Sequence, residues 1–390
     1  MRSRIVDSGL PSFNAPFTAC AKRSCLSSSI SRPASRRVSS SSSSVSASAP
    51  EPPKRRLWLR LTMLTATAAG VGAYVRWLQD SGKSTLNPFS FTKYYLVSKE
   101  PVSSTCSIFV FKPANADGNC ELYEKAWRAG VWSVMFKQPQ LQIARDYTPL
   151  PPTSSMTSQE DGSLHFLIRR DPHGEVSRYL HALDLWTAVE MRGPQVECEI
   201  PSTIRDVLFI AGGTGIAPAL QAGHTLLSRT DGSRKPRIHI LWASRRREDC
   251  LGGVSDTKAT VKPKSWFSGF IRSAEADPAL GGSQDKNTSS SFIVRELEAL
   301  KSQYPDQITV DYFVDEEGTS IGKQTISDVI QSTYASSPSS DSKLIMVSGP
   351  DGFIGYMAGP KVWAQGMELQ GPLQGVIKEL DLKDWAVWKL

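Results

Sequence analysis

This sequence lacks clustered cysteines. Its 390 residues include six cysteines, and no two of them have a C-x-x-C or other metal-binding spacing. Cys20 and Cys25 lie near the N-terminus, and the other four are scattered along the chain. The spacing argues against a disulfide framework and against a metal site, and it predicts packed or free thiols.

Acidic residues are almost absent from the first 60 positions. Only Asp7 and Glu51 oppose eleven lysines and arginines there, whereas the rest of the chain is close to neutral. The net charge of +7 therefore lies in the N-terminal segment, and we expect no nucleic-acid binding. Residues 1–50 are also rich in serine, which is typical of a mitochondrial presequence. A plain disordered tail is the alternative.

Long apolar runs are also scarce, and one segment at 57–78 qualifies as a transmembrane helix. It carries no charge from Leu61 to Val75, and about 20 apolar residues are needed to span a membrane. A buried soluble helix or part of the targeting signal are the alternatives. More positive charge precedes the segment than follows it, so its N-terminal side should stay in the negative compartment. In a mitochondrial inner membrane, the C-terminal region would face the intermembrane space.

Two strand patterns follow this segment. Residues 88–200 contain short strands between turn signals, which predicts a small antiparallel β-barrel. In residues 203–390, apolar strands alternate with helical stretches, which predicts a doubly wound α/β domain. Within it, residues 252–291 are polar and rich in glycine, serine and lysine, so we expect a flexible surface insertion.

The Gly-rich sequence A-G-G-T-G-I-A-P at 211–218 is the most informative motif. It follows the apolar run Val207 to Ile210 and precedes a helical run. Strand, Gly-rich turn and helix together form a phosphate site, because glycine lets the backbone approach closely and the helix N-terminus offers free N–H groups. A merely tight turn is the alternative.

Two further motifs lie in the first domain. In R-D-Y-T-P at 145–149 we expect Arg145, Tyr147 and Thr148 to share one face of a strand and to contact a flat cofactor and its pyrophosphate. The sequence G-E-V-S at 174–177 precedes a helical run and again offers N–H groups to an anion, with charge added by Arg169 and Arg170. A conventional N-cap at Ser177 is the alternative.

The order R-x-Y-T-P, G-x-x-S, G-G-T-G-I-A-P and a late S-G-P-D-G-F at 348–353 resembles the ferredoxin–NADP reductase superfamily, in particular its cytochrome b5 reductase-like branch. The resemblance implies a β-barrel FAD domain joined to an NAD(P)-binding domain. It also implies an FAD-dependent NAD(P)H oxidoreductase that passes electrons to a haem acceptor. No acid–base dyad is needed for that chemistry, so the five histidines are expected to be structural or exposed.

The resemblance also implies a role for each matching residue. FAD would be held by Arg145, Tyr147 and Thr148, and its pyrophosphate by Gly174, Val176 and Ser177 together with Arg169. The nicotinamide nucleotide would meet Gly213, Thr214, Gly215, Ser348, Gly349, Pro350 and Phe353. Thr148 and Ser348 would be the catalytic residues. Ser348 replaces the cysteine that often begins this loop in the family, and the chain ends in W-K-L where many members end in Phe or Tyr.

The nucleotide preference depends on charges that follow two strands. Arg245, Arg246 and Arg247 could take the 2′-phosphate of NADPH. Asp315 would repel that phosphate, and the family resemblance therefore favours NADH. The arginines could instead serve the pyrophosphate or face solvent.

With its leader and single helix, the chain is similar in layout to fungal inner-membrane flavoproteins that support haem attachment to apocytochrome c. This implies a partner in the cytochrome c maturation machinery and a lipid membrane contacted through one helix. A reductase on the outer membrane that serves a b5-type haem protein is one alternative. An import or assembly factor that is largely non-catalytic is the other.

Overall fold

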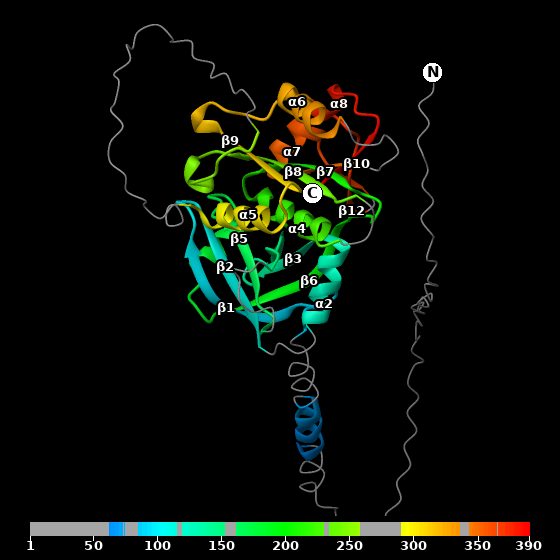
Figure 1. Ribbon diagram of the computed structural model, residues 1–390. Helices are drawn as coiled ribbons and strands as arrows, with labels where there is room; N and C mark the ends of the chain where they lie inside the picture. The colour runs from blue at the N-terminus through cyan, green and yellow to red at the C-terminus, as the bar shows by residue number, and fades with distance from the viewer. Residues whose placement is uncertain are drawn as a thin grey trace, which may run out of the picture. The chain divides into compact units, whose positions relative to one another are not determined.

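The computed structural model describes residues 62–72, 74, 85–114, 119–152, 161–229, 234–257, 290–335, 343–364 and 366–390 (Figure 1). The chain divides into two compact units, Met1–Thr67 and Ala68–Leu390, and the fold below belongs to the second. The predicted presequence lies outside the described residues, and so do positions 258–289 of the predicted insertion.

The predicted membrane segment is described only in part. Residues 62–72 are helical and exposed, whereas 57–61 and 75–78 lie outside the described residues. Within the described ranges, no helix combines the length and the apolar character that membrane crossing requires.

The first domain is a six-stranded antiparallel barrel with the strand order β4-β3-β6-β1-β2-β5. A bridge between Pro149 and Phe166 closes it, and the Leu150 N–H donates to the His165 carbonyl at 2.7 Å. The short strands predicted for this region are observed. The strands are β1 (Thr92–Pro101), β2 (Cys106–Pro113), β3 (Gly130–Gln138), β4 (Ile143–Tyr147), β5 (Leu164–Arg169) and β6 (Ala188–Glu199).

Aromatic side chains fill the barrel because alternate residues of each strand point inward. The Phe166 ring is fully buried, and its centroid lies 4.9 Å from that of Phe136 and 6.0 Å from that of Phe111. Two helices, α2 (Asn119–Ala129) and α3 (Glu175–Ala182), complete the domain. The sequence interpretation assigned only strands to the region of α2, and in this respect it was wrong.

The second domain has a five-stranded parallel sheet with the order β13-β10-β7-β8-β9. Chain order runs outward from β7 to β9 and then returns to β10 and β13 on the other side, so the predicted doubly wound α/β fold is confirmed. The strands are β7 (Asp206–Gly212), β8 (Arg237–Ser244), β9 (Ile308–Val314), β10 (Lys343–Ser348) and β13 (Trp385–Lys389).

Helices cover both faces of this sheet. Figure 1 shows α4 and α5 on the face toward the barrel, and α6, α7 and α8 on the opposite face. The helices are α4 (Ile216–Leu227), α5 (Phe292–Gln303), α6 (Lys323–Tyr334), α7 (Asp351–Ala358) and α8 (Gly375–Glu379). The short elements are η2 (Gly213–Gly215), η3 (Arg247–Cys250) and η4 (Asp315–Glu317), with a hairpin of β11 (Val362–Ala364) and β12 (Met367–Leu369).

The strand order fixes where a ligand can bind. β7 and β10 are neighbours, yet the connections that leave their carboxyl ends lead to opposite faces of the sheet. In open α/β sheets a crevice forms at this switch point, outside the carboxyl ends of the strands. The site is therefore expected around Gly212–Gly215 and Ser348–Gly349.

Removing the Phe166 ring tests whether the aromatic core holds the barrel together. We expect Phe166→Ala to lower the free energy of unfolding by about 3–5 kcal/mol, because it leaves a cavity between two other rings. Urea denaturation of the purified protein would measure the loss. Phe166→Leu should cost less, and Leu141→Ala, at a side chain that is 57% exposed, should cost almost nothing. Equal stability of Phe166→Ala and Leu141→Ala would contradict this account of the core.

Candidate functional site

The Gly-rich turn lies at the carboxyl end of β7, where the sequence places it. Gly213 has a φ of 56°, a backbone conformation that residues other than glycine rarely adopt. Its carbonyl accepts a 2.9 Å hydrogen bond from the Trp242 indole N–H. A Cβ on Gly215 would lie 2.5 Å from the Ser348 carbonyl oxygen. The glycines therefore let the ends of β7 and β10 meet, and Trp242 fixes the orientation of the turn.

Helix α4 begins directly after this turn, at Ile216. No side chain caps its N-terminus, so the positive end of its dipole faces the turn. The Ile216 N–H already bonds to the Gly213 and Thr214 carbonyls of η2. Pro218 lies in the first turn of α4. A backbone N–H at that position has no hydrogen-bond partner within the helix, so proline, which lacks the N–H, is tolerated there. The residues Gly213, Thr214 and Gly215 thus form the turn between strand and helix that the sequence predicts.

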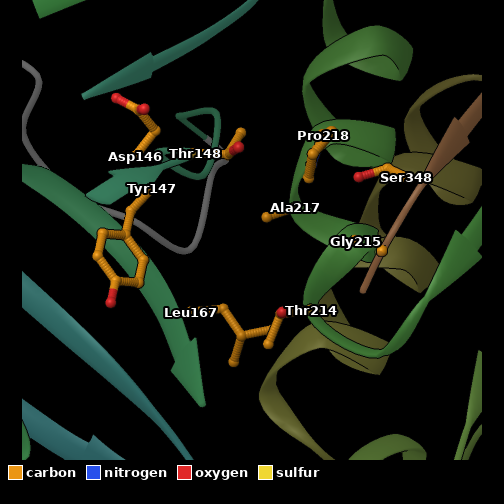
Figure 2. Close-up of a pocket in the computed structure, with 10 residues that line it drawn as sticks. Asp146, Tyr147, Thr148, Leu167, Thr214, Gly215, Ala217, Pro218 and Ser348 are labelled. Carbon is orange, nitrogen blue, oxygen red and sulfur yellow. The ribbon is translucent and has the colours of Figure 1, made fainter. Parts of the chain in front are cut away.

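The loop after β10 forms the neighbouring wall. Ser348 is buried, and Gly349 and Pro350 lead into α7. The Phe353 ring lies against Gly212, where an added Cβ would come within 2.8 Å of the ring. Figure 2 shows the Ser348 hydroxyl pointing toward Pro218, into the space between the two domains.

The barrel contributes three consecutive residues: Asp146, Tyr147 and Thr148. We predicted that Arg145, Tyr147 and Thr148 would share one strand face. That prediction was wrong, because β4 ends at Tyr147 and Thr148 lies beyond the strand. Tyr147 packs edge-on against Phe136 with a centroid distance of 5.2 Å, and its burial raises the pKa of its hydroxyl.

These two walls enclose one pocket with a volume of about 200 Å³. Figure 2 shows Tyr147 and Thr148 on the barrel side, facing Ala217, Gly215 and Ser348 on the other. The lining residues are Asp146, Tyr147, Thr148, Leu167, Thr214, Gly215, Ala217, Pro218, Ser348 and Gly349.

Asp146 gives the pocket a titratable group. Desolvation raises the pKa of its carboxyl to about 6, although part of the side chain reaches solvent, and the negative charge of Glu197 adds to the rise. Asp146 therefore gains a proton as the pH falls through about 6. The sequence interpretation did not name Asp146, Leu167, Ala217 and Pro218 as site residues, although all except Leu167 lie within the motifs R-D-Y-T-P and A-G-G-T-G-I-A-P.

The second anion site predicted from the sequence is the N-terminus of α3. Gly174 is its N-cap and provides no side-chain cap, so the alternative in which Ser177 is the N-cap was wrong. The Ser177 hydroxyl accepts from the Asp171 N–H and donates to the Gly174 carbonyl, each at 3.1 Å. Ser177 therefore shapes the turn, while Val176 is buried beneath it and the first N–H groups of the helix stay open.

The two basic residues predicted to bind FAD differ in their environment. Arg145 is exposed and donates to the Ala144 carbonyl at 2.9 Å, which leaves its other donors for an anion. The Arg169 guanidinium pairs with Asp249 at 2.8 Å, beside Gly213. It thus links β5 of the barrel to η3 of the second domain, and its charge is already compensated.

The charges that bear on nucleotide preference lie after β8 and β9. Arg246 pairs with Glu248 at 3.2 Å, and Arg247 pairs with Glu317. Arg245 is exposed, and its side chain forms no hydrogen bond or ion pair with the residues that the structure describes. Asp315 is likewise exposed at the start of η4.

FAD fits this arrangement on the chemistry of the groups present. An aromatic ring and a hydroxyl line the pocket on the barrel side, and an uncapped helix with an arginine nearby suits a pyrophosphate. The four described cysteines, Cys106, Cys120, Cys198 and Cys250, are free thiols, as the sequence predicts.

Comparison with known proteins agrees with this geometry. Residues 93–200 match the family model of the oxidoreductase FAD-binding domain. The chain is 30% identical over 154 residues to the cytochrome c mitochondrial import factor CYC2 of Saccharomyces cerevisiae, over 36% of this chain and 42% of that protein. It is 25% identical over 252 residues to NADH-cytochrome b5 reductase 2 of Emericella nidulans, over 63% and 62%.

The matches thus span less than two thirds of the length of these two relatives. Among solved structures, the cytochrome b5 reductase domain of Ulva prolifera nitrate reductase aligns over 78% of this chain and 99% of that chain. The TM-score is 0.49 and the sequence identity 17%.

The pocket, the barrel around it and the matched family model agree on the identity of the first domain. The chain contains an oxidoreductase FAD-binding domain, and with its nucleotide-binding domain it has a fold like that of ferredoxin–NADP reductase and cytochrome b5 reductase.

Proposed function

We propose that this chain is an FAD-dependent NAD(P)H oxidoreductase that passes electrons to a haem protein. One observation carries the proposal: a single pocket joins Tyr147 and Thr148 of the FAD-binding domain to Gly215 and Ser348 at the switch point of the α/β sheet. Both cofactors must meet for electrons to pass, and this pocket is where residues of the two domains lie together.

The residues divide into two groups by what they would hold. Tyr147 and Thr148 would hold the flavin ring. Arg145 and the open turn at Gly174–Ser177 would hold the pyrophosphate. FAD held there would supply the ability to accept a hydride from the nicotinamide and to release single electrons to haem iron. The chain itself binds and orients both groups and supplies the hydroxyls of Thr148 and Ser348 to the reacting centre.

NADH is the proposed nucleotide. Two of the three arginines after β8 are already paired with glutamates, so their charge is not free for a 2′-phosphate. Asp315 remains as an exposed negative charge after β9. A phosphate placed near it would be repelled. NADH-cytochrome b5 reductases among the relatives use the same nucleotide by name.

Attachment of haem to cytochrome c is the proposed context, in the mitochondrial inner membrane with the C-terminal domain in the intermembrane space. The similarity to a cytochrome c mitochondrial import factor supports this, and so does the basic, serine-rich leader. The apolar segment at 57–78 is the proposed anchor. A reductase for a b5-type haem protein is the second candidate, supported by the similarity to NADH-cytochrome b5 reductases.

Flavin reduction tests the proposal directly. We expect the purified protein to carry bound FAD and to lose its yellow colour on anaerobic addition of NADH, followed by stopped-flow absorbance. Ser177→Asp should be nearly colourless, because a carboxylate at the open turn repels the pyrophosphate. Ser302→Asp, at an exposed position on α5, should stay yellow. A yellow protein that neither NADH nor NADPH bleaches would overturn the enzyme proposal.

Asp315 tests the nucleotide preference. We expect Asp315→Ser to lower the KM for NADPH by about tenfold while the KM for NADH changes little, because a repulsive charge is removed. Steady-state reduction of ferricyanide would give both values. Asp328→Ser on α6 removes the same charge from an exposed position elsewhere and should leave the ratio of the two KM values unchanged. An unchanged ratio in Asp315→Ser would rule out its role.

Trp242 tests the Gly-rich turn. Trp242→Phe removes the indole N–H that holds the Gly213 carbonyl, and we expect the Kd of NADH to rise about three- to tenfold. The limiting rate of flavin reduction should stay the same. Tyr312→Phe is the matched control. Its ring centroid lies 5.8 Å from that of Trp242, and its buried hydroxyl has no hydrogen-bond partner among the residues that the structure describes. A Kd that rises equally in both variants would point to packing instead.

A further inference from the structure

Gln221 is a fully buried polar residue in the middle of α4, and both ends of its side-chain amide are engaged in the other domain. Its Oε1 accepts from the Trp132 backbone N–H at 2.8 Å. Its Nε2 donates to the Pro149 carbonyl at 2.7 Å. One side chain of the nucleotide-binding domain therefore holds two separate backbone segments of the barrel.

These two backbone segments adjoin Tyr147 and Thr148, which line the pocket on the barrel side. Pro149 directly follows Thr148. Trp132 lies in β3, two residues before Val134, which is the ladder partner of Tyr147. A shift of either hydrogen bond would therefore move Tyr147 and Thr148 relative to α4.

The other end of the connection reaches the nucleotide side. Gln221 follows Ala217 by four residues and Pro218 by three, so it lies on the same face of α4 as these two lining residues. The amide thus joins the wall made by α4 to the wall made by the end of β4. Its burial leaves no water to replace either hydrogen bond if the amide is removed.

We propose that Gln221 is a positioning residue that sets the separation between the flavin side and the nucleotide side of the pocket. The inference rests on the proposed function, because it concerns the transfer between the two cofactors held there. Transfer is sensitive to small errors in the approach of the reacting atoms, and a displacement of about 1 Å can slow a reaction about a hundredfold. Binding of each cofactor alone depends on its own wall and should change little.

Thr225 provides a matched control on the same helix. Its hydroxyl also crosses to the first domain, where it lies 2.7 Å from the Trp127 carbonyl oxygen and 3.4 Å from that of Gly130, at the start of β3. Trp127 lies on α2, away from the residues that line the pocket. Thr225→Val therefore removes buried hydrogen bonding between the domains at α2 and the first residue of β3, while both hydrogen bonds of Gln221 stay in place.

Two substitutions of Gln221, together with Thr225→Val, separate an effect on positioning from an effect on stability. Gln221→Leu removes both hydrogen bonds. Gln221→Glu can restore both when the introduced carboxyl is protonated, since it then accepts from the Trp132 N–H and donates to the Pro149 carbonyl. When ionised it can no longer donate. Burial disfavours the ionised form, so the pKa of the introduced carboxyl should be raised in the folded protein.

The rate measurement uses the full chain with FAD bound and stopped-flow reduction by NADH. We expect Gln221→Leu to lower the limiting reduction rate about ten- to a hundredfold at every pH, with the Kd of NADH within about threefold of the unsubstituted value. The primary isotope effect with NADH deuterated at C4 should rise. Gln221→Glu should recover its rate as the pH falls, and Thr225→Val should keep the normal rate.

A second measurement is independent of activity. Thermal unfolding of the FAD-free protein should show Gln221→Glu more stable than Gln221→Leu at low pH. The folded-state pKa of the introduced carboxyl is raised, so this advantage is complete below its unfolded pKa and is lost as the pH rises through the folded pKa.

The outcomes are distinct. Unsubstituted protein that NADH and NADPH both fail to reduce would overturn the proposed function and this inference with it. Normal reduction by the unsubstituted protein, with Gln221→Leu no slower than Thr225→Val, would overturn the inference alone. A slow Gln221→Leu whose loss is not recovered by Gln221→Glu at low pH would also overturn it, because the two hydrogen bonds would then not be the cause.

Discussion

The close approach of β7 and β10 at their carboxyl ends is the constraint on which the site depends. A Cβ on Gly215 would lie 2.5 Å from the Ser348 carbonyl oxygen, and a Cβ on Gly212 would lie 2.8 Å from the Phe353 ring. A side chain at Gly215 would therefore push the end of β10 away, and one at Gly212 would displace the Phe353 ring. Because Thr214 and Ser348 line one pocket only when these ends meet, two glycines determine whether the sheet presents a site at all.

The barrel and the α/β sheet share one apolar core on the side that bears the pocket. Buried residues of the barrel, among them Ile108 and Leu167, belong to the same hydrophobic cluster as Ile216 and Leu220 of α4. Burial of that apolar surface stabilises the contact between the two domains but does not specify their relative orientation. The relative orientation of the domains comes from polar contacts, among them Gln221 with the barrel backbone, Arg169 with Asp249 and Thr225 with the Trp127 carbonyl. The apolar cluster holds the domains together, and the polar contacts fix their relative orientation.

The strands of the sheet could be predicted from sequence because apolar runs such as 207–210 and 344–347 are buried on both faces. β6 gave a weaker signal, since it contains Gly193-Pro194, which argues against a central strand, and its ladder with β3 absorbs the disruption through register shifts. Motif glycines and Tyr147 were predictable because backbone conformation and cofactor chemistry restrict those positions to few residue types. Gln221 and Trp242 were not, because their partners are backbone groups 89 and 29 residues away.

Counting charges gives a misleading view of what the nucleotide site would bind. Three consecutive arginines follow β8, and by number alone they favour an additional phosphate. In the folded chain, Arg246 and Arg247 are held by Glu248 and Glu317, so most of that positive charge is compensated before any ligand arrives. A paired guanidinium must break a charge-assisted hydrogen bond to reach a phosphate, and this offsets part of the gain. Among the described residues at this edge, Glu316 and Glu317 contact Arg247, whereas Arg245 and Asp315 are exposed and form no ion pair. Arg245 and Asp315 are therefore the charges that an incoming phosphate would meet.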